Sequence, residues 1–373
     1  MNKLDDIKNF KLGLYVHIPF CKKRCIYCDF VSYVENNFDE YTEYLLKEID
    51  LYKEYLNSGI DTLYIGGGTP SIFPIKNISK IFEKLEPYIS NNAEITIEVN
   101  PESFTKENAQ FYKKIGVNRI SMGLQSADDV VLKKSGRLYD FETFIRKFDI
   151  AKRYFDNINV DFIIGLPGES WSTIGKNVQF ISDFLPDHIS VYMLEVHNDK
   201  NNSVLKKPDD QTFQRYDDFL NAISGFGYER YEISNFALNG KYCKHNLKYW
   251  ANTDYVGLGI SAGGHIGFLR YNNHESFSDY FISISEGKFP RAYESLNTPE
   301  REALETTFMN LRTMLGVDKE YIKEKTNIDI SPVMDALKNK FDFFDGKKLS
   351  EKGMDFSNLF FVTLLSFWEE YFR

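Results

Sequence analysis

Apolar segments rich in β-forming residues alternate with amphipathic segments, and this alternation restricts the possible folds most. Six segments are predicted strands: 13–18, 62–65, 94–99, 119–124, 158–164 and 188–196. Five segments between them are predicted helices: 38–56, 78–89, 106–115, 141–154 and 171–185. Strands that alternate with helices form parallel β-α-β units. The pattern therefore predicts an α/β fold, either an open barrel of six β/α units or a doubly wound open sheet.

The composition is typical of a folded protein and argues against a general nucleic-acid-binding protein. The 373 residues carry 45 Lys and Arg against 54 Asp and Glu, a net charge of −9, and 43% are hydrophobic. An acidic chain is not expected to bind nucleic acid or anionic membranes. Asp5 and Asp6 stand where a secretory signal has basic residues, and the apolar run 359–368 is too short to span a bilayer. We therefore expect a cytoplasmic protein.

The cysteines are unevenly placed. Cys21, Cys25 and Cys28 lie within eight residues with the spacing C-x3-C-x2-C, and Cys243 lies far away. Cytoplasmic thiols stay reduced, so a disulfide framework is not expected. Structural zinc usually takes four ligands from paired C-x2-C motifs, and only one such motif is present. The spacing favours an iron–sulfur cluster with one iron left open for a ligand. A zinc site and unligated structural cysteines remain the alternatives.

Polar residues occur where the predicted strands end. Tyr15 and His17 belong to the first strand, and the string GGGTP at 66–70 follows the second. Three further strand positions carry a polar side chain among apolar neighbours: Glu98, Gln125 and Asp161. Parallel α/β folds form their active sites at the carboxyl ends of strands. Because buried polar groups need partners, these residues predict a polar cofactor at that end, although solvated strand ends are the alternative for each.

The cysteine segment, with Tyr27 before its last cysteine, resembles the radical S-adenosylmethionine (SAM) superfamily. The resemblance implies that Cys21, Cys25 and Cys28 hold a [4Fe–4S] cluster and that SAM binds its open iron. It also implies the radical SAM fold, an open (β/α)6 partial TIM barrel.

Longer strings extend the resemblance over most of the chain. The strings YVHIPF (15–20), GGGTP (66–70), IEVNP (97–101), RISMGLQ (119–125) and VDFIIGLP (160–167) are similar to the anaerobic coproporphyrinogen III oxidase-like branch. This branch includes the haem chaperone HemW family. The resemblance implies that SAM is contacted by Tyr15, Tyr27, Gly67, Gly68, Thr69, Glu98, Gln125, Arg137 and Asp161. The corresponding position on the sixth strand is Glu195, where the dehydrogenase has a small residue.

Two features favour the chaperone family over the dehydrogenase. The cysteine triad is followed by Asp29 and Phe30, whereas the dehydrogenase has a glycine and a fourth cysteine there. The string HNLKYW at 245–250 resembles the haem-binding motif of the chaperones. It implies that His245 contacts or ligates haem, with Tyr249 and Trp250 beside the macrocycle. Cys243 is a haem ligand, a neighbour of the cluster or a buried thiol, and the residues do not decide among these.

The resemblance implies a haem chaperone that binds haem, a [4Fe–4S] cluster and SAM, and delivers haem to apo-haemoproteins such as respiratory enzymes. The alternative is an oxygen-independent coproporphyrinogen III dehydrogenase, which decarboxylates its substrate oxidatively. A third hypothesis is a radical SAM enzyme for an unrelated substrate, so enzymatic activity stays open. Transient membrane-associated partners and a homodimer are further hypotheses.

The chain divides into three predicted parts: a core barrel (1–235), a connecting segment with the HNxxYW motif (236–297) and a C-terminal α+β winged-helix-like domain (298–373). In the last part the pattern predicts helices, a hairpin at 341–350 and a final helix at 355–372. Its acidic character argues against DNA binding, so we expect a lid or a docking surface. His265 is a candidate polar contact, and His188, His197 and His274 are expected at the surface.

Overall fold

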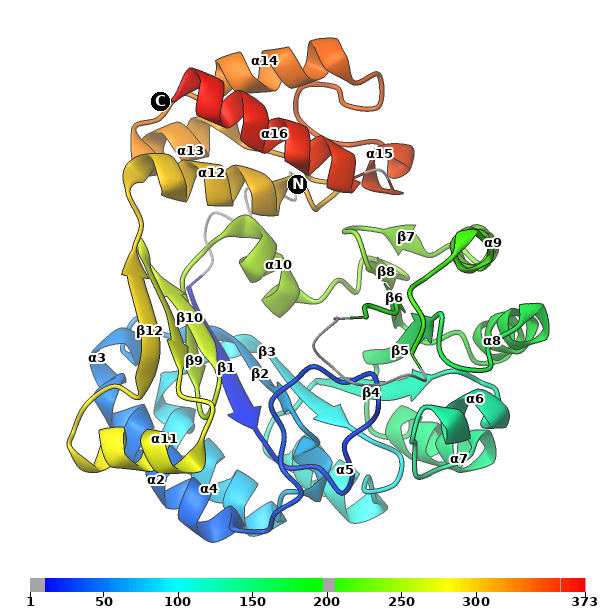
Figure 1. Ribbon diagram of the computed structural model, residues 1–373. Helices are drawn as coiled ribbons and strands as arrows, with labels where there is room; N and C mark the ends of the chain where they lie inside the picture. The colour runs from blue at the N-terminus through cyan, green and yellow to red at the C-terminus, as the bar shows by residue number, and fades with distance from the viewer. Residues whose placement is uncertain (1–10, 197–204, 356, 373) are drawn as a thin grey trace.

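A computed structural model describes residues 11–196, 205–355 and 357–372. Residues 1–10, which include Asp5 and Asp6, and His197 lie outside the described residues. The described strands form one sheet in the order β12-β11-β10-β9-β1-β2-β3-β4-β5-β6-β8-β7. Figure 1 shows this sheet curving through the lower part of the molecule, below a layer of helices.

Six parallel strands form the core of the sheet. They are β1 (Leu12–Ile18), β2 (Ile60–Gly67), β3 (Ile89–Val99), β4 (Arg119–Gln125), β5 (Ile158–Ile164) and β6 (His188–Met193). Each pairs in parallel with the next strand of the chain, whereas β1 and β6 do not pair with each other. A doubly wound sheet reverses its strand order near the middle. The sequential order observed here confirms the open barrel and rules out that alternative.

Helices between these strands cover the outer face of the barrel (Figure 1). They are α2 (Phe38–Leu51), α3 (Lys53–Leu56), α4 (Ile75–Leu85), α5 (Lys106–Lys114), α6 (Asp129–Lys134), α7 (Phe141–Lys152) and α8 (Trp171–Phe184). Local signals define several starts, because Thr105 and Ser170 each form a capping box at the first turn of α5 and α8. The predicted single helix at 38–56 is wrong, since α2 ends at Leu51 and a short second helix follows Tyr52.

Residues 210–297, which contain the segment predicted as a connection (236–297), extend the sheet at both edges. Four strands continue it beyond β1: β9 (Tyr255–Leu258), β10 (Gly263–Ile266), β11 (Leu269–Asn273) and β12 (Arg291–Leu296). Two short strands continue it beyond β6: β7 (Glu229–Arg230) and β8 (Asn235–Ala237). Three helices belong to this region: α9 (Asp210–Ser224), α10 (Lys244–Ala251) and α11 (Phe277–Ser285). A side chain on Gly257 would overlap the carbonyl oxygen of Gly263, so glycine permits the close turn between β9 and β10.

The C-terminal residues form a helical layer with its own hydrophobic core. The layer contains α12 (Pro299–Asn310), α13 (Lys319–Thr326), α14 (Ser331–Lys340), α15 (Glu351–Asp355) and α16 (Ser357–Tyr371). Its buried apolar side chains run from Ala303 to Trp368 and form a cluster separate from the barrel core. At the predicted hairpin the described residues show a single antiparallel bridge, between Phe344 and Leu349. The winged-helix-like architecture stays a prediction.

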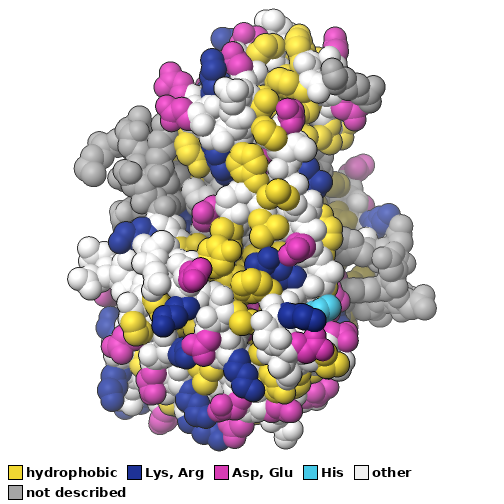
Figure 2. All heavy atoms as spheres, turned by 90° about the vertical axis from the view of Figure 1, so that its left-hand side faces the viewer, with side chains coloured by type: hydrophobic (Ala, Val, Ile, Leu, Met, Phe, Trp, Pro, Cys, Tyr) yellow, Lys and Arg dark blue, Asp and Glu magenta, His cyan; other side chains and the backbone are white. Residues whose placement is uncertain are grey.

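The face shown in Figure 2 carries Lys and Arg interspersed with Asp and Glu on its lower half, and hydrophobic side chains gather through its middle. Among the described residues, no helix has the length and apolar character required to cross a lipid bilayer.

Candidate functional site

The three clustered cysteines lie in the irregular segment that follows β1. All three are free, half-buried and line one cavity of about 490 Å³. Backbone hydrogen bonds hold this segment against the turn after β2, because Thr69 N–H donates to Phe20 O (2.7 Å) and Gly68 N–H donates to Ile18 O (2.9 Å). Cys21 Sγ lies 3.5 Å from Thr69 Oγ1. Burial raises the pKa of the Cys21 and Cys28 thiols.

The glycines of the GGGTP turn make this close approach possible. Gly67 has a φ of +114°, which other residues rarely adopt. A Cβ on Gly67 would lie 2.5 Å from the ring of His17, and one on Gly68 would lie 2.6 Å from the carbonyl oxygen of Phe20. The bare backbone therefore borders the cavity directly beside Cys21, as a close-fitting cofactor requires.

Glu98 on β3 joins this turn to the barrel interior. Its carboxylate accepts hydrogen bonds from the Tyr64 hydroxyl (2.9 Å) and from Gly67 N–H (3.1 Å). Burial raises the pKa of Glu98 to about 7, and the nearby charge of Asp161 adds to the effect. Burial also raises the pKa of Asp161, which accepts a hydrogen bond from Asn159 Nδ2 (2.7 Å).

Arg137 contacts the cysteine segment through Tyr27. Its Nη1 donates to Asn100 Oδ1 (3.1 Å), and its guanidinium lies 5.9 Å from the ring centre of Tyr27 and 5.4 Å from that of Tyr139. These distances are compatible with cation–π contacts. Gln125 ends β4 with a φ of +69° and lines the same cavity.

The structure brings together most of the residues predicted to bind SAM. Eight of the nine line the cavity with the cysteines: Tyr27, Gly67, Gly68, Thr69, Glu98, Gln125, Arg137 and Asp161. Glu195 lines it as well. Tyr15 does not line it, and its hydroxyl lies 3.0 Å from Nδ1 of His17. His17 Nε2–H in turn donates to Val31 O (2.9 Å), which links β1 to the cysteine segment.

Several polar residues of the cavity were not predicted. Arg119, Ser121, Asn159 and Ser190 also line it. The sequence feature that could have identified these residues is the alternation along the strands, because side chains at i and i+2 point to the same face. On β4 the residues Arg119, Ser121, Gly123 and Gln125 all face the cavity. The interior of this barrel is therefore polar along its length.

The cavity connects the two ends of the barrel. The cysteine segment follows the carboxyl end of β1, whereas Asn246 belongs to α10 at the opposite end (Figure 1). A residue of β3, Glu94, holds α10 at this end of the barrel. The carboxylate of Glu94 accepts from the N–H groups of Lys244 (3.1 Å) and His245 (3.0 Å) at the first turn of α10. Asn246 of the HNxxYW motif and the cysteine triad thus border a single internal space.

The ring of His245 is buried beside this space and does not line it. Nδ1 lies 2.8 Å from Thr62 Oγ1, and Nε2 lies 2.7 Å from the Tyr249 hydroxyl. Burial lowers the pKa of His245 to about 3. Cys243 is buried as well, and its Sγ lies 3.7 Å from a Glu94 carboxylate oxygen. Cys243 therefore lies with the motif helix and not with the cysteine triad.

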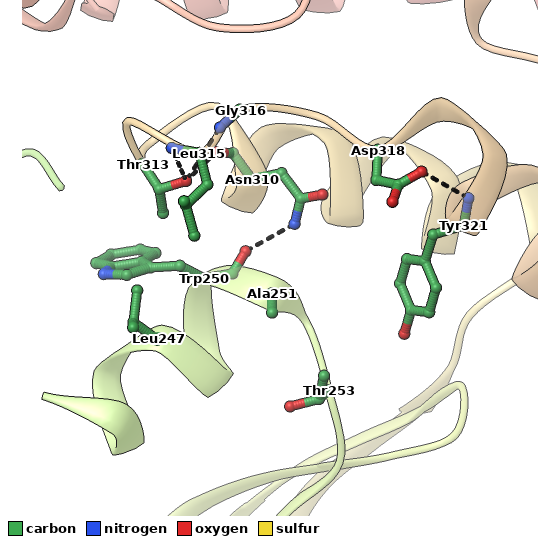
Figure 3. A pocket seen from close by; sticks show the side chains of 10 residues that line it. All are labelled: Leu247, Trp250, Ala251, Thr253, Asn310, Thr313, Leu315, Gly316, Asp318 and Tyr321. Atoms are coloured by element: carbon green, nitrogen blue, oxygen red, sulfur yellow. Dashed lines mark hydrogen bonds between the residues drawn. The ribbon is translucent and has the colours of Figure 1, made fainter. Parts of the chain in front are cut away.

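Trp250 of the motif points toward the C-terminal layer. It lines a small cavity of about 30 Å³ that Leu247, Leu315 and Tyr321 also border (Figure 3). Asn310 Nδ2 donates to the Trp250 carbonyl (2.8 Å). The Asn310 side chain thus links α10 to the helical layer. Of the motif helix, the first turn, with Asn246, reaches the main cavity.

Two of the other histidines have clear structural roles. The expectation that His188 lies at the surface is wrong, because it faces the barrel interior from the start of β6. Its Nδ1–H donates to Asn159 Oδ1 (2.6 Å), and its Nε2 accepts from the Tyr231 hydroxyl (2.7 Å). His265 is buried, with Nε2 3.2 Å from Glu302 Oε1. His274 is partly buried.

The arrangement of the thiols fits a cluster better than a zinc ion. Within the described residues, no three His, Cys, Asp or Glu side chains converge closely enough to hold a single metal ion. A tetrahedral zinc ion needs all its sulfur ligands about 2.3 Å from one point. In an iron–sulfur cluster the thiolates bind different irons and can lie farther apart. Three thiols that face one cavity beside bare glycine backbone therefore suit a cluster with an adjacent cofactor.

Comparisons with known proteins agree with this geometry. Residues 15–181 match the Radical SAM superfamily, which implies a [4Fe–4S] cluster and SAM. The chain is 34% identical over 371 residues to the heme chaperone HemW of Buchnera aphidicola subsp. Schizaphis graminum, covering 93% of this chain and 96% of that protein. It is 31% identical over 354 residues to HemW of Bacillus subtilis, covering 91% of each chain.

The structure of coproporphyrinogen III oxidase (HemN) from Escherichia coli, described as a radical SAM enzyme, is similar to that of this chain. The TM-score is 0.83 at 22% identity, and the alignment covers 97% of this chain and 92% of that one. At this identity the similarity shows the fold. Together with the sequence matches, it shows that the chain belongs to the heme chaperone HemW family of the radical SAM superfamily.

Proposed function

We propose that this protein is a haem chaperone, which binds haem together with a [4Fe–4S] cluster and SAM and delivers the haem to apo-haemoproteins such as respiratory enzymes. The relatives named heme chaperone HemW align over nearly the whole chain. The likeness to coproporphyrinogen III oxidase is one of fold, and it supports the dehydrogenase alternative less well.

Within this proposal, Cys21, Cys25 and Cys28 hold the cluster, which when bound supplies electrons one at a time. The cavity residues around them bind SAM. Gly67 and Gly68 offer backbone groups, and Arg137 offers a guanidinium. Glu98 and Asp161 offer hydrogen-bond acceptors. Tyr15 acts indirectly, because its hydroxyl orients His17 against the cysteine segment.

The observation that carries the haem assignment is the position of the motif helix. α10 places Asn246 in the same cavity as the cysteines, and the His245 ring lies directly behind it. A neutral imidazole is a common ligand for iron, and burial keeps His245 neutral at pH 7. We infer that haem contacts the motif helix at the amino end of the barrel, the end at which the parallel strands begin. The C-terminal layer then serves as a lid or as a docking surface for the recipient.

The test is a parallel assay on anaerobically reconstituted protein. The cluster is loaded, SAM and a reductant are added, and haem retention and coproporphyrinogen III conversion are measured on the same preparation. We expect stoichiometric haem retention, transfer to an apo-haemoprotein and no conversion. Turnover of the porphyrinogen would contradict the chaperone proposal. Haem retention that survives His245→Ala would contradict only the assignment of this ligand.

A further inference from the structure

Arg119 is a buried cation whose Nε–H has no hydrogen-bond partner among the described residues. It begins β4, only 2% of the residue is exposed, and it lines the main cavity. Its Nε–H is buried and has no acceptor. Among the described residues, no side chain forms a hydrogen bond or an ion pair with its guanidinium. An unpaired buried charge is costly, so this site in the folded protein favours an anion.

The carboxylates near Arg119 are engaged elsewhere. Glu94 binds the N–H groups at the start of α10. Glu98 accepts from Tyr64 and Gly67, and Asp161 accepts from Asn159. Burial raises the pKa of Glu98 to about 7, which lowers the negative charge of this carboxyl near neutral pH. Burial also raises the pKa of Asp161.

The other titratable neighbours of Arg119 are neutral at pH 7. Burial raises the pKa of the Cys243 thiol to about 12. Burial also raises the pKa of Tyr64 and Tyr231 well above the usual value. None of these groups supplies a negative charge to Arg119. The Glu94 carboxylate supplies negative charge near Arg119, but among the described residues no carboxylate forms an ion pair with the guanidinium.

Arg119 lies far from the cysteines along the barrel axis. Gln125, at the carboxyl end of β4, is six positions further along the strand, a distance of about 20 Å at roughly 3.3 Å per residue. Asn246 of the motif helix lines the same cavity as Arg119. The side chains between the two ends are small or polar: Ser121, Asn159 and Ser190. A ligand that enters from the cysteine end and reaches the motif helix thus meets a guanidinium at the far end.

We propose that Arg119 is a carboxylate-binding residue of the haem site, and that its guanidinium pairs with a propionate of the bound haem. The proposal rests on the haem chaperone function proposed above and assigns it a recognition element. Guanidinium and carboxylate match in shape and form charge-assisted hydrogen bonds, often two at once. The carboxylate of SAM is the other possible source of this group, but the residues proposed to bind SAM lie around the cysteines.

The test compares haem with its dimethyl ester, in which both propionates are uncharged. Binding of each is titrated by Soret absorbance to the full-length wild type and to Arg119→Gln, Arg119→Lys and Arg146→Gln. Arg146 lies on the exposed side of α7 and serves as a matched control. We expect the wild type to bind haem on the order of 10-fold to 100-fold more tightly than the ester. The ratio of haem affinity to ester affinity should fall close to one in Arg119→Gln. It should take an intermediate value in Arg119→Lys and keep the wild-type value in Arg146→Gln.

A second measurement separates the two sources of the carboxylate. SAM binding to the cluster-loaded protein, followed by equilibrium dialysis, should be equal in the wild type and in Arg119→Gln. A loss of SAM affinity with an unchanged haem-to-ester ratio would overturn the proposal in favour of the SAM carboxylate.

The remaining outcomes distinguish this proposal from the proposed function. If the wild type binds haem and the ester equally, the Arg119 assignment is wrong and the chaperone function stands. If the wild type binds neither, both fail. Should Arg119→Gln not fold, as judged by circular dichroism, the wild-type ratio and Arg119→Lys still decide the result.

Discussion

Nε2 of His245 lies 2.7 Å from the hydroxyl of Tyr249, so the residue proposed as the haem ligand is already bound by another residue of the same motif. The other ring nitrogen is held by Thr62. Iron can reach Nε2 only if it displaces the tyrosine hydroxyl, one turn away on α10. The HNxxYW motif therefore pairs the proposed ligand with a hydroxyl that competes for the same nitrogen.

Removing the competitor should strengthen haem binding. We expect Tyr249→Phe to bind haem roughly five-fold more tightly than the wild type, because one hydrogen bond of about 1 kcal/mol no longer opposes ligation. Soret titration of the two proteins measures the difference. The gain should vanish in the double variant His245→Ala/Tyr249→Phe. An unchanged affinity in a folded Tyr249→Phe protein would show that iron does not compete for Nε2.

The two kinds of cysteine should respond differently to substitution. We expect Cys25→Ser to retain the fold but to lose the brown iron–sulfur chromophore, because a thiolate ligand is missing. Cys243→Ser is the matched control, since this thiol lies beside Glu94 at the other end of the cavity. It should keep both iron and colour. Iron analysis and visible spectra after anaerobic reconstitution check the result, and a normal spectrum in Cys25→Ser would contradict cluster ligation.

Glu98 should give the protein a measurable pH dependence. Burial raises its pKa from 4.5 to about 7. Between these values the folded protein holds a proton that the unfolded chain releases, so the stability contributed by Glu98 falls as the pH rises. Glu98→Gln cannot titrate. Its free energy of unfolding, relative to the wild type, should therefore increase by about 1–3 kcal/mol between pH 4.5 and pH 8.

Urea unfolding of the cofactor-free proteins across this pH range provides the measurement. Any hydrogen bond that glutamine makes less well than glutamate changes both ends of the range equally and cancels in the comparison. A difference between variant and wild type that is constant with pH would show that Glu98 titrates normally.

Glu302 should be the main polar link between the sheet and the C-terminal layer. Its buried carboxylate on α12 lies 3.2 Å from His265 Nε2, accepts from Lys325 Nζ (2.7 Å), and accepts from the amides of Asn252 and Asn297 (2.8 and 2.9 Å). Burial alone raises the pKa of Glu302, but His265 and Lys325 outweigh it and bring the value to about 2.

Glu302→Gln should lower the free energy of unfolding by about 3 kcal/mol, because it leaves the largely buried Lys325 ammonium without its counter-charge. Glu300→Gln, an exposed position on the same helix, should change it by less than about 0.5 kcal/mol. Denaturant unfolding measures both. Equal stabilities of the two variants would show that the network contributes little.

The sequence predicted the barrel better than its edges. The strands β1 to β6 are buried and regularly spaced, so each produces a clear apolar run between helices. The strands β9 to β11 contain four or five residues each and include several glycines. Such short segments carry weak periodicity, and their pairing beyond β1 depends on a partner more than two hundred residues away in the chain.

Histidine positions show the same limit. His188 begins a predicted strand, but only the register of β6 against β5 decides that its ring meets Asn159. His245 was found through its motif, whereas its two hydroxyl partners come from β2 and from its own helix. Local patterns identify the candidates, and packing determines their partners.

The amino-acid sequence by itself determined the alternation of strands and helices, the cysteine triad and the polar residues at strand ends, because these features depend on spacing within one segment. Only the tertiary structure decided that the triad, Arg119 and Asn246 border one cavity. That convergence depends on the parallel register of the strands and on the docking of α10 against Glu94. Both are contacts between residues distant in sequence, and a local sequence pattern does not contain the information that predicts them.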